Sequence, residues 1–80
     1  MIDAHIIKKR LLETFLDAEI QITDLTGTGD HWEVSIKAKE FSGKSLIEQH
    51  KMVYKALNLW INKEIHALAL HTSCFNHVET

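Results

Sequence analysis

Histidine is the most prominent candidate for a functional side chain in this sequence, because six histidines occur among only 80 residues. A neutral imidazole is a common metal ligand, and its charge changes near neutral pH. His31 directly follows the only glycine-rich loop, and His66 opens a short run rich in Ala and Leu. These positions make His31 and His66 candidate metal ligands. The alternative for each is an ordinary surface histidine or a capped core histidine.

The segments that carry these two histidines are predicted to be neighbouring strands. Residues 32–38 alternate apolar and polar side chains, which is typical of a strand buried on one face. A strand over residues 19–25 is expected to pair with it as an antiparallel hairpin. The helical connection to a third strand, residues 65–73, favours parallel pairing with residues 32–38. Neighbouring strands lie about 4.8 Å apart, so the imidazoles of His31 and His66 could converge on one metal atom or small cluster.

Two other residues are excluded as ligands. His71 lies an odd number of residues after His66, so a regular strand directs it to the opposite face. Cys74 is the only cysteine, and the chain therefore has no internal disulfide and no Cys-x-x-Cys motif. We expect Cys74 to be a free thiol. His50 is expected to pack or cap within a helical segment.

Two helical patterns complete the organisation of the chain. Residues 3–17 place Ile7, Leu11 and Phe15 four apart, which predicts one apolar helix face. Residues 45–62 have a helical pattern that opens with the capping-box spacing Ser-x-x-Glu. The expected core joins this helix to the alternating strand: Trp32, Val34, Ile36, Val53, Leu57 and Ile61.

Length and composition exclude several classes of protein. Eighty residues predict one small domain, residues 1–80, that buries about 60% of its unfolded surface. The net charge of −2 disfavours a dedicated nucleic-acid binder, which usually carries a basic surplus. No apolar run approaches the roughly 20 residues of a membrane span, and no signal peptide is recognisable, so a cytoplasmic location is expected. No nucleophile motif or paired-carboxylate site is present, and the chain is not expected to be an enzyme.

Two motifs resemble the BolA family. They are Phe-x-Gly-Lys-x-Leu…His-Lys-x-Val-Tyr at residues 41–54 and His-Ala-Leu…Thr at residues 66–72. The resemblance covers roughly residues 20–72. It implies an α+β fold of order α-β-β-α-α-β, similar to the type II KH domain. A three-stranded mixed sheet would carry its helices on one face, and the second helical region would split near residues 49–51 into a helix-turn-helix.

The resemblance also implies a cofactor and a partner. In the BolA family the positions of His66 and His31 are taken as ligands to a [2Fe–2S] cluster. The segment Gly-Thr-Gly-Asp-His-Trp resembles the His-type version of the family's loop. Such a cluster normally has four ligands, so the others would come from a monothiol glutaredoxin, through its active-site cysteine and bound glutathione. The implied function is a non-enzymatic adaptor for cluster trafficking or iron sensing.

The expected strands also predict which of the two candidate ligands, His31 or His66, is more important for binding the metal. His66 is expected to be the indispensable ligand, because it begins a central, regular strand. His31 follows a flexible Gly-Thr-Gly loop, and its position is expected to be less fixed. Whether the free protein is a monomer or a homodimer stays open.

The alternative function is that of a DNA-binding transcriptional regulator. Lys44, His50, Lys51 and Lys55 would form a small basic strip on the helix-turn-helix, a unit that docks in the major groove. The plainer interpretation of this strip is a solvated helix face. The Gly-x-x-Gly clamp of RNA-binding KH domains is absent from the helix turn.

Overall fold

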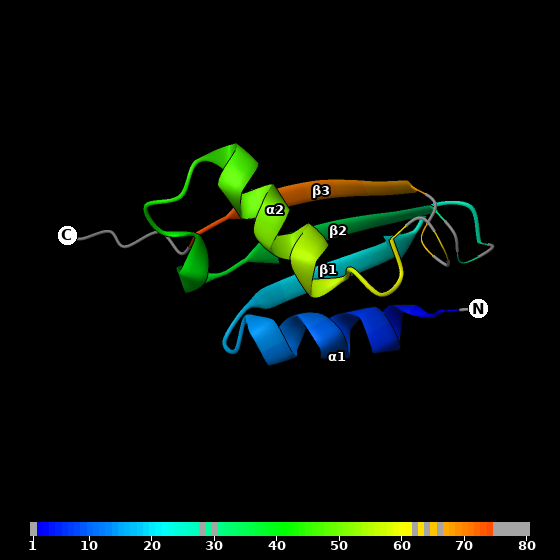
Figure 1. Ribbon diagram of the computed structural model, residues 1–80. Helices are drawn as coiled ribbons and strands as arrows, with labels where there is room; N and C mark the ends of the chain where they lie inside the picture. Colours follow the sequence, from blue (N-terminus) through cyan, green and yellow to red (C-terminus); the bar gives the residue numbers. More distant parts are fainter. Residues whose placement is uncertain are drawn as a thin grey trace.

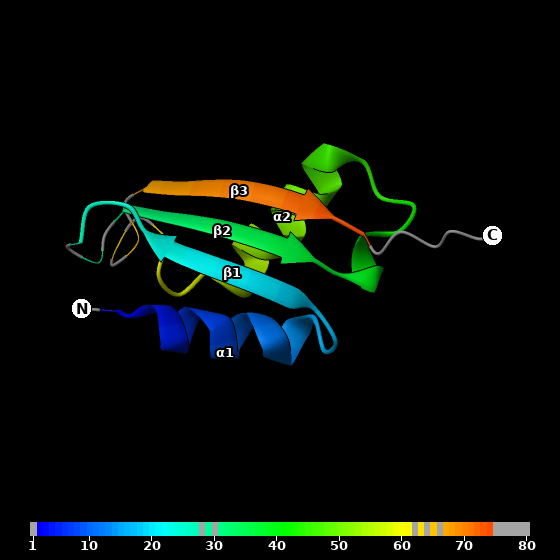
Figure 2. The same cartoon turned by 180° about the vertical axis from the view of Figure 1, so that it is seen from behind.

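The structure is a computed structural model that describes residues 2–27, 29, 31–61, 63, 65 and 67–74. Its elements are α1 (Ala4–Thr14), β1 (Glu19–Asp24), β2 (His31–Lys37), the short 3₁₀ helix η1 (Lys39–Phe41), α2 (Leu46–Ala56) and β3 (Ala67–Ser73). The helix α2 crosses one face of the sheet and α1 lies alongside β1 (Figure 1). From behind, no helix among the described residues crosses the front of the strands (Figure 2). The chain therefore has the expected α+β fold with one open sheet face.

The sheet is mixed, with strand order β1-β2-β3. β1 and β2 pair antiparallel, with Ile22 opposite Val34, and β2 and β3 pair parallel, with Val34 opposite Leu70. Both pairings confirm the predicted hairpin and crossover. The order differs from expectation in one respect, because β2 is the central strand and β3 lies at the edge.

The core forms where the inward faces of the strands meet the apolar stripes of the helices. The stripe of α1 is buried as predicted, and the rings of Phe15 and Phe41 pack with centroids 5.1 Å apart. Ile61, expected in the core, is only half-buried and makes an isolated parallel bridge to Ile65, which is buried instead. The largest fully buried side chains of the core are Ile7, Leu11, Phe15, Val34, Ile36, Phe41, Val53, Leu57 and Ile65.

The second helical region is one unbroken helix, so the predicted split near residues 49–51 is wrong. α2 runs from Leu46 to Ala56 without a break, and it ends before residue 62, the predicted end of the helical region. No glycine or proline lies within it to break the backbone ladder. The short η1 precedes α2 and lies before the segment, residues 45–62, in which the helix-turn-helix was predicted. No helix in the described part of the chain is long and apolar enough to cross a membrane.

Side chains tie α2 to its surroundings at its N-terminal end. The Gln49 amide group donates to the carbonyl of Lys44 at 3.0 Å and to that of Phe41 at 3.4 Å. Its oxygen accepts from the Thr72 hydroxyl at 2.6 Å. Gln49 therefore connects α2 to the turn after η1 and to β3, which holds the helix at one position over the sheet.

The predicted capping box is present at the start of α2. The Ser45 hydroxyl accepts from the Glu48 backbone N–H at 3.2 Å, and the Glu48 carboxylate accepts from the Ser45 N–H at 2.9 Å. This backbone hydrogen bond is the main reason why the pKa of Glu48 lies below its ordinary value of 4.5. The Ser45 hydroxyl and the charges of Lys44 and Lys51 act in the same direction. The backbone N–H groups of Ser45 and Glu48 are both satisfied in this way.

Acid is expected to loosen this helix start. A carboxyl group with a lowered folded-state pKa stabilises the fold fully above its unfolded value, and this contribution is lost as the pH falls through the folded value. Amide hydrogen exchange at the start of α2 should therefore accelerate, relative to the core, as the pH falls below about 4.5. In Glu48→Gln, which keeps a neutral capping box, this acid-dependent difference should disappear. Identical pH profiles for the two proteins would contradict the assignment.

Candidate metal-binding edge of the sheet

The first residues of β2 and β3 lie at the same edge of the sheet, as the sequence predicts. Parallel pairing places His31 opposite Ala67, at the right-hand end of the strands in Figure 1. His66 lies outside the described residues, so the convergence of the two imidazoles stays a prediction. What the structure establishes is that His31 occupies the start of the central strand and that β3 begins beside it.

His31 belongs to the open face of the sheet. Its neighbour Trp32 is buried in the core, and side chains alternate along a strand, so His31 lies on the side without helices. The residue opposite His31 is Ala67, whose exposed methyl side chain occupies little space. His31 itself is half-buried. An imidazole in this setting is accessible to a second protein that approaches the sheet edge.

The loop before His31 is held by the residues on either side of it. Asp24 accepts from the backbone N–H groups of Thr26 at 3.3 Å, Gly27 at 2.9 Å and Gly29 at 2.9 Å. The Trp32 indole donates to the Gly29 carbonyl at 2.9 Å. The loop was expected to be flexible, and its described residues are hydrogen-bonded to side chains at the end of β1 and the start of β2. The sequence signal was Asp at the start of a glycine-rich turn, where its carboxylate commonly accepts from following N–H groups.

The positive backbone angles of this loop explain its glycines. Gly27 and Gly29 have φ values of 76° and 83°. Side chains with a Cβ rarely adopt this left-handed conformation, whereas glycine does so at little cost. The two glycines let the chain turn tightly enough for Asp24 to reach three N–H groups.

Glu33 and His71 form a second polar feature on the open face. Their Oε2 and Nε2 atoms lie 2.9 Å apart, and about half of each side chain is exposed, 43% for Glu33 and 62% for His71. An ion pair at this exposure contributes little to stability. By register, His71 lies on the same face as His31, so the expectation that it lies on the face opposite the candidate ligands is wrong for His31. Within the described ranges, no group of three or more His, Cys, Asp or Glu residues could hold a metal ion.

Cys74 lies far from the candidate ligand edge. It follows Ser73, which pairs with Lys37 at the opposite end of the parallel strands from His31. With about 3.3 Å per residue, the strand length separates Cys74 from that edge by about 20 Å. Its side chain is exposed and is not part of a disulfide. A free thiol was predicted, and the separation excludes Cys74 as a ligand shared with His31.

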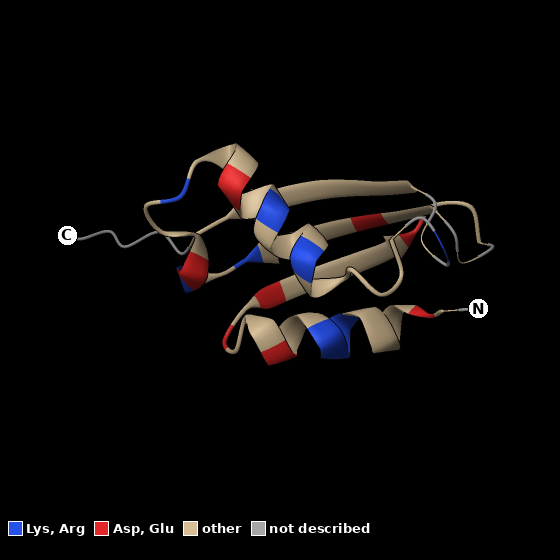
Figure 3. Cartoon of the chain, in the orientation of Figure 1, with Lys and Arg blue, Asp and Glu red and all other residues tan. Residues whose placement is uncertain are grey.

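The basic strip is only partly present. Lys44, Lys51 and Lys55 are exposed on α2 and the turn before it, and their backbone positions appear in blue in Figure 3. His50, the fourth predicted member, is half-buried, and its Nε2 atom is buried with no hydrogen-bond partner among the described residues. His50 is therefore partly packed, as expected, and it is less exposed than the three lysines. Glu48 lies among these lysines and reduces their net charge.

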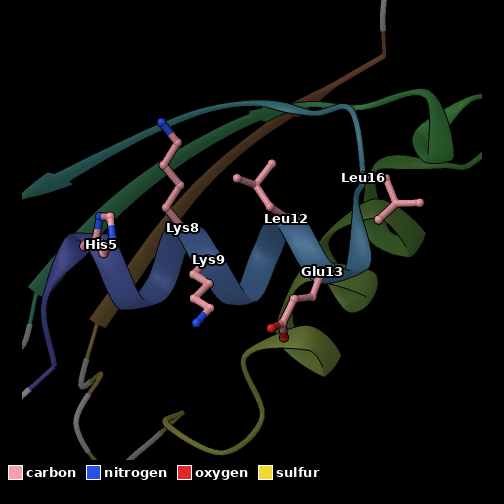
Figure 4. Close-up of a pocket in the computed structure, with 6 residues that line it drawn as sticks. All are labelled: His5, Lys8, Lys9, Leu12, Glu13 and Leu16. Atoms are coloured by element: carbon pink, nitrogen blue, oxygen red, sulfur yellow. The ribbon is translucent and has the colours of Figure 1, made fainter.

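A hollow of about 590 Å³ lies over α1. Figure 4 shows that Lys8 and Lys9 point to different sides of the helix, so the hollow is open. His31 is not among its lining residues, and the hollow is not part of the candidate site. It is lined by His5, Lys8, Lys9, Leu12, Glu13 and Leu16.

Comparison with known families gives a match over most of the chain. The family model described as BolA-like protein matches residues 7–76. An uncharacterized protein of Rickettsia prowazekii, RP812, is 41% identical over 71 residues, which are 89% of this chain and 92% of that protein. The NMR structure of RP812 has a TM-score of 0.72 at 39% identity and covers 94% of this chain and 97% of its own.

Two further relatives extend the comparison. BolA1 from Arabidopsis thaliana has a TM-score of 0.85, and the match covers 99% of this chain and 100% of that chain. Its 23% identity shows the fold alone. An Escherichia coli protein named DNA-binding transcriptional regulator BolA is 27% identical over 73 residues, which are 82% of this chain and 70% of that protein. The names of these relatives describe a regulator or an uncharacterized protein and not an enzyme.

Proposed function

Because the chain belongs to the BolA family, we propose that it is a non-enzymatic adaptor that binds a monothiol glutaredoxin and shares a [2Fe–2S] cluster with it. The adaptor would serve iron–sulfur cluster trafficking or iron sensing. The observation that supports this proposal best is the position of His31. It starts the central strand on the open face, opposite the small side chain of Ala67 and at the edge where β3 begins.

The potential metal ligands of this chain fit a cluster that is shared with a partner better than a cluster bound by this chain alone. A [2Fe–2S] cluster normally takes four ligands. In the described part of the chain, no three potential ligands gather, and Cys74 is at the far end of the strands. His31 and His66 would supply two nitrogen ligands, and the partner's cysteine and its bound glutathione would supply two thiolates.

Histidine ligation would give the site two chemical properties. When bound, a cluster with two imidazoles in place of two thiolates has a higher reduction potential, as in Rieske centres. Each imidazole must be neutral to bind a metal, so the ligands of this chain would release the metal in mild acid. The open face above His31 and Ala67 would let the partner approach, and the held Gly loop would keep His31 in place.

The test is reconstitution of the mixed complex. The protein is combined with a glutathione-loaded monothiol glutaredoxin, iron and sulfide, and the visible absorption and circular dichroism spectra are recorded. The expected spectrum differs from that of the glutaredoxin alone, and the two proteins should co-elute in size-exclusion chromatography. A spectrum equal to that of the glutaredoxin alone, without co-elution, would refute the proposal.

DNA binding is the second proposed function. It is supported by the name of the E. coli relative and by the exposed side chains of Lys44, Lys51 and Lys55. The contact would be made by the outer face of the single helix α2 and the turn before it. The net charge of −2 opposes it, because phosphate contacts provide most of the non-specific affinity for DNA.

Duplex binding is expected to be weak at physiological salt. Three lysine–phosphate contacts would give a slope of log affinity against log salt concentration of about −3. Fluorescence anisotropy with labelled duplexes measures both quantities. The double variant Lys44→Glu/Lys51→Glu should abolish any binding, whereas Lys8→Glu/Lys9→Glu on α1 is the charge-matched control. Sequence-specific nanomolar binding that only the first variant abolishes would make DNA the primary ligand.

A further inference from the structure

Gly29 is held from both strands of the hairpin. Asp24 is the last residue of β1 and lies opposite Trp32 of β2. The Asp24 Oδ2 atom accepts from the Gly29 N–H at 2.9 Å, and the Trp32 Nε1–H donates to the Gly29 carbonyl at 2.9 Å. Gly29 is buried. Both polar groups of this residue are therefore bonded to side chains that belong to the sheet.

These two side chains are themselves firmly placed. The Trp32 ring is only 2% exposed, and a buried indole N–H usually requires a partner. The Asp24 carboxylate accepts from Thr26 and Gly27 as well, so three N–H groups bind one charged acceptor. Hydrogen bonds to an ionised acceptor are stronger than those between neutral groups. The loop is thus anchored to the core on one side and to a charged acceptor on the other.

The anchored residue lies two positions before His31. On the far side of the loop, the His31 carbonyl accepts from the Leu25 N–H at 2.9 Å, which closes the hairpin. The backbone of His31 is therefore held by the sheet and by the Gly29 clamp together. A ligand that is already in place loses less conformational entropy when it binds.

We propose that Asp24 and Trp32 are positioning residues that hold Gly29 and thereby present His31 to the partner-bound metal. This inference rests on the proposed function for its metal, but the placement of His31 can be measured in the free protein. Neither residue is a ligand. Asp24 acts on the loop through its carboxylate, and Trp32 acts through its indole N–H.

Asp24→Asn separates this role from general folding. The amide keeps an oxygen that can accept from Thr26 and Gly27, but its NH₂ group cannot accept from the Gly29 N–H. In the free protein, amide exchange at Gly29 should accelerate about tenfold, as expected when a hydrogen bond to a charged group is lost. Backbone relaxation should show increased motion at His31. The matched control is Asp17→Asn, because Asp17 is an exposed carboxylate that pairs with Lys39 in another part of the molecule.

The mixed complex supplies the second readout. With the glutaredoxin, iron and sulfide, Asp24→Asn should shift the visible circular dichroism bands and speed cluster loss to a chelator, while Asp17→Asn matches wild type. Trp32→Phe, which removes the indole donor and also shrinks a buried ring, should act in the same direction. Faster motion at Gly29 and His31 with an unchanged spectrum and chelation rate would overturn the positioning role. Unchanged motion would overturn the clamp.

A wild-type protein that forms no mixed cluster would refute the proposed function, and the free-protein measurements would still decide whether the clamp holds His31.

Discussion

His31→Ala and His66→Ala are each expected to abolish the His-ligated visible spectrum of the mixed complex with a monothiol glutaredoxin. In the proposed complex each substitution would remove one of four ligands, and the two thiolates of the partner would not replace it. The sequence alone ranked His31 as the weaker ligand. The structure removes both reasons for that ranking, because His31 starts the central strand and its loop is held by Asp24 and Trp32.

The matched control is His71→Ala. His71 lies on the open face of the same sheet, and its Nε2 atom contacts Glu33 at 2.9 Å. It should therefore leave the visible absorption and circular dichroism spectra of the complex unchanged. Far-ultraviolet circular dichroism of each isolated variant should match wild type. If His31→Ala or His66→Ala gave a wild-type spectrum, that residue would not be a ligand. If the isolated variant lost its fold, the residue would have a structural role instead.

Ile36→Ala and Leu57→Ala are each expected to lower the free energy of unfolding by about 2–5 kcal/mol. Ile36 is 1% exposed and Leu57 is fully buried, and they come from the central strand and the end of α2. Truncating either side chain removes its transfer free energy and leaves a cavity between the sheet and the helix. A loss of this size is a large fraction of the 5–15 kcal/mol that is typical of native domains. Urea unfolding followed by tryptophan fluorescence measures it.

Exposed apolar residues provide the controls for this experiment. Ile47 and Leu59 are 69% and 60% exposed. Alanine at either position should change the free energy of unfolding by less than about 0.5 kcal/mol. If Ile36→Ala or Leu57→Ala behaved like these surface variants, the packing of the sheet against α2 would be assigned incorrectly.

Regular repetition in the sequence determined most of the fold. The alternation in β2 and the four-residue spacing in α1 depend only on the geometry of a strand and a helix. The capping box at Ser45 and Glu48 depends on residues three apart, so it too was predictable. The parallel pairing of β2 with β3 followed from the helical connection between them. These features depend on residues that are close in the sequence or on chain connectivity, so the sequence alone is sufficient to predict them.

The sequence predicted that His31 lies at the edge where β2 and β3 begin, but the tertiary structure decided how His31 is held. The Gly29 clamp needs Asp24 and Trp32 from two strands, and only the register of the hairpin brings their side chains to the same residue. The central place of β2 followed from its two predicted pairings, whereas the expectation that the strand after His66 is central was wrong, because β3 lies at the edge.

Packing decided the outcome for α2 and His50. The resemblance suggested a break near residues 49–51, but α2 is continuous from Leu46 to Ala56 and buries Val53 and Ala56 in the core. The same packing turns His50 partly inward and leaves Lys44, Lys51 and Lys55 outside. Which side of a helix faces the core depends on the surface against which it packs, and that surface exists only once residues distant in the sequence have come together.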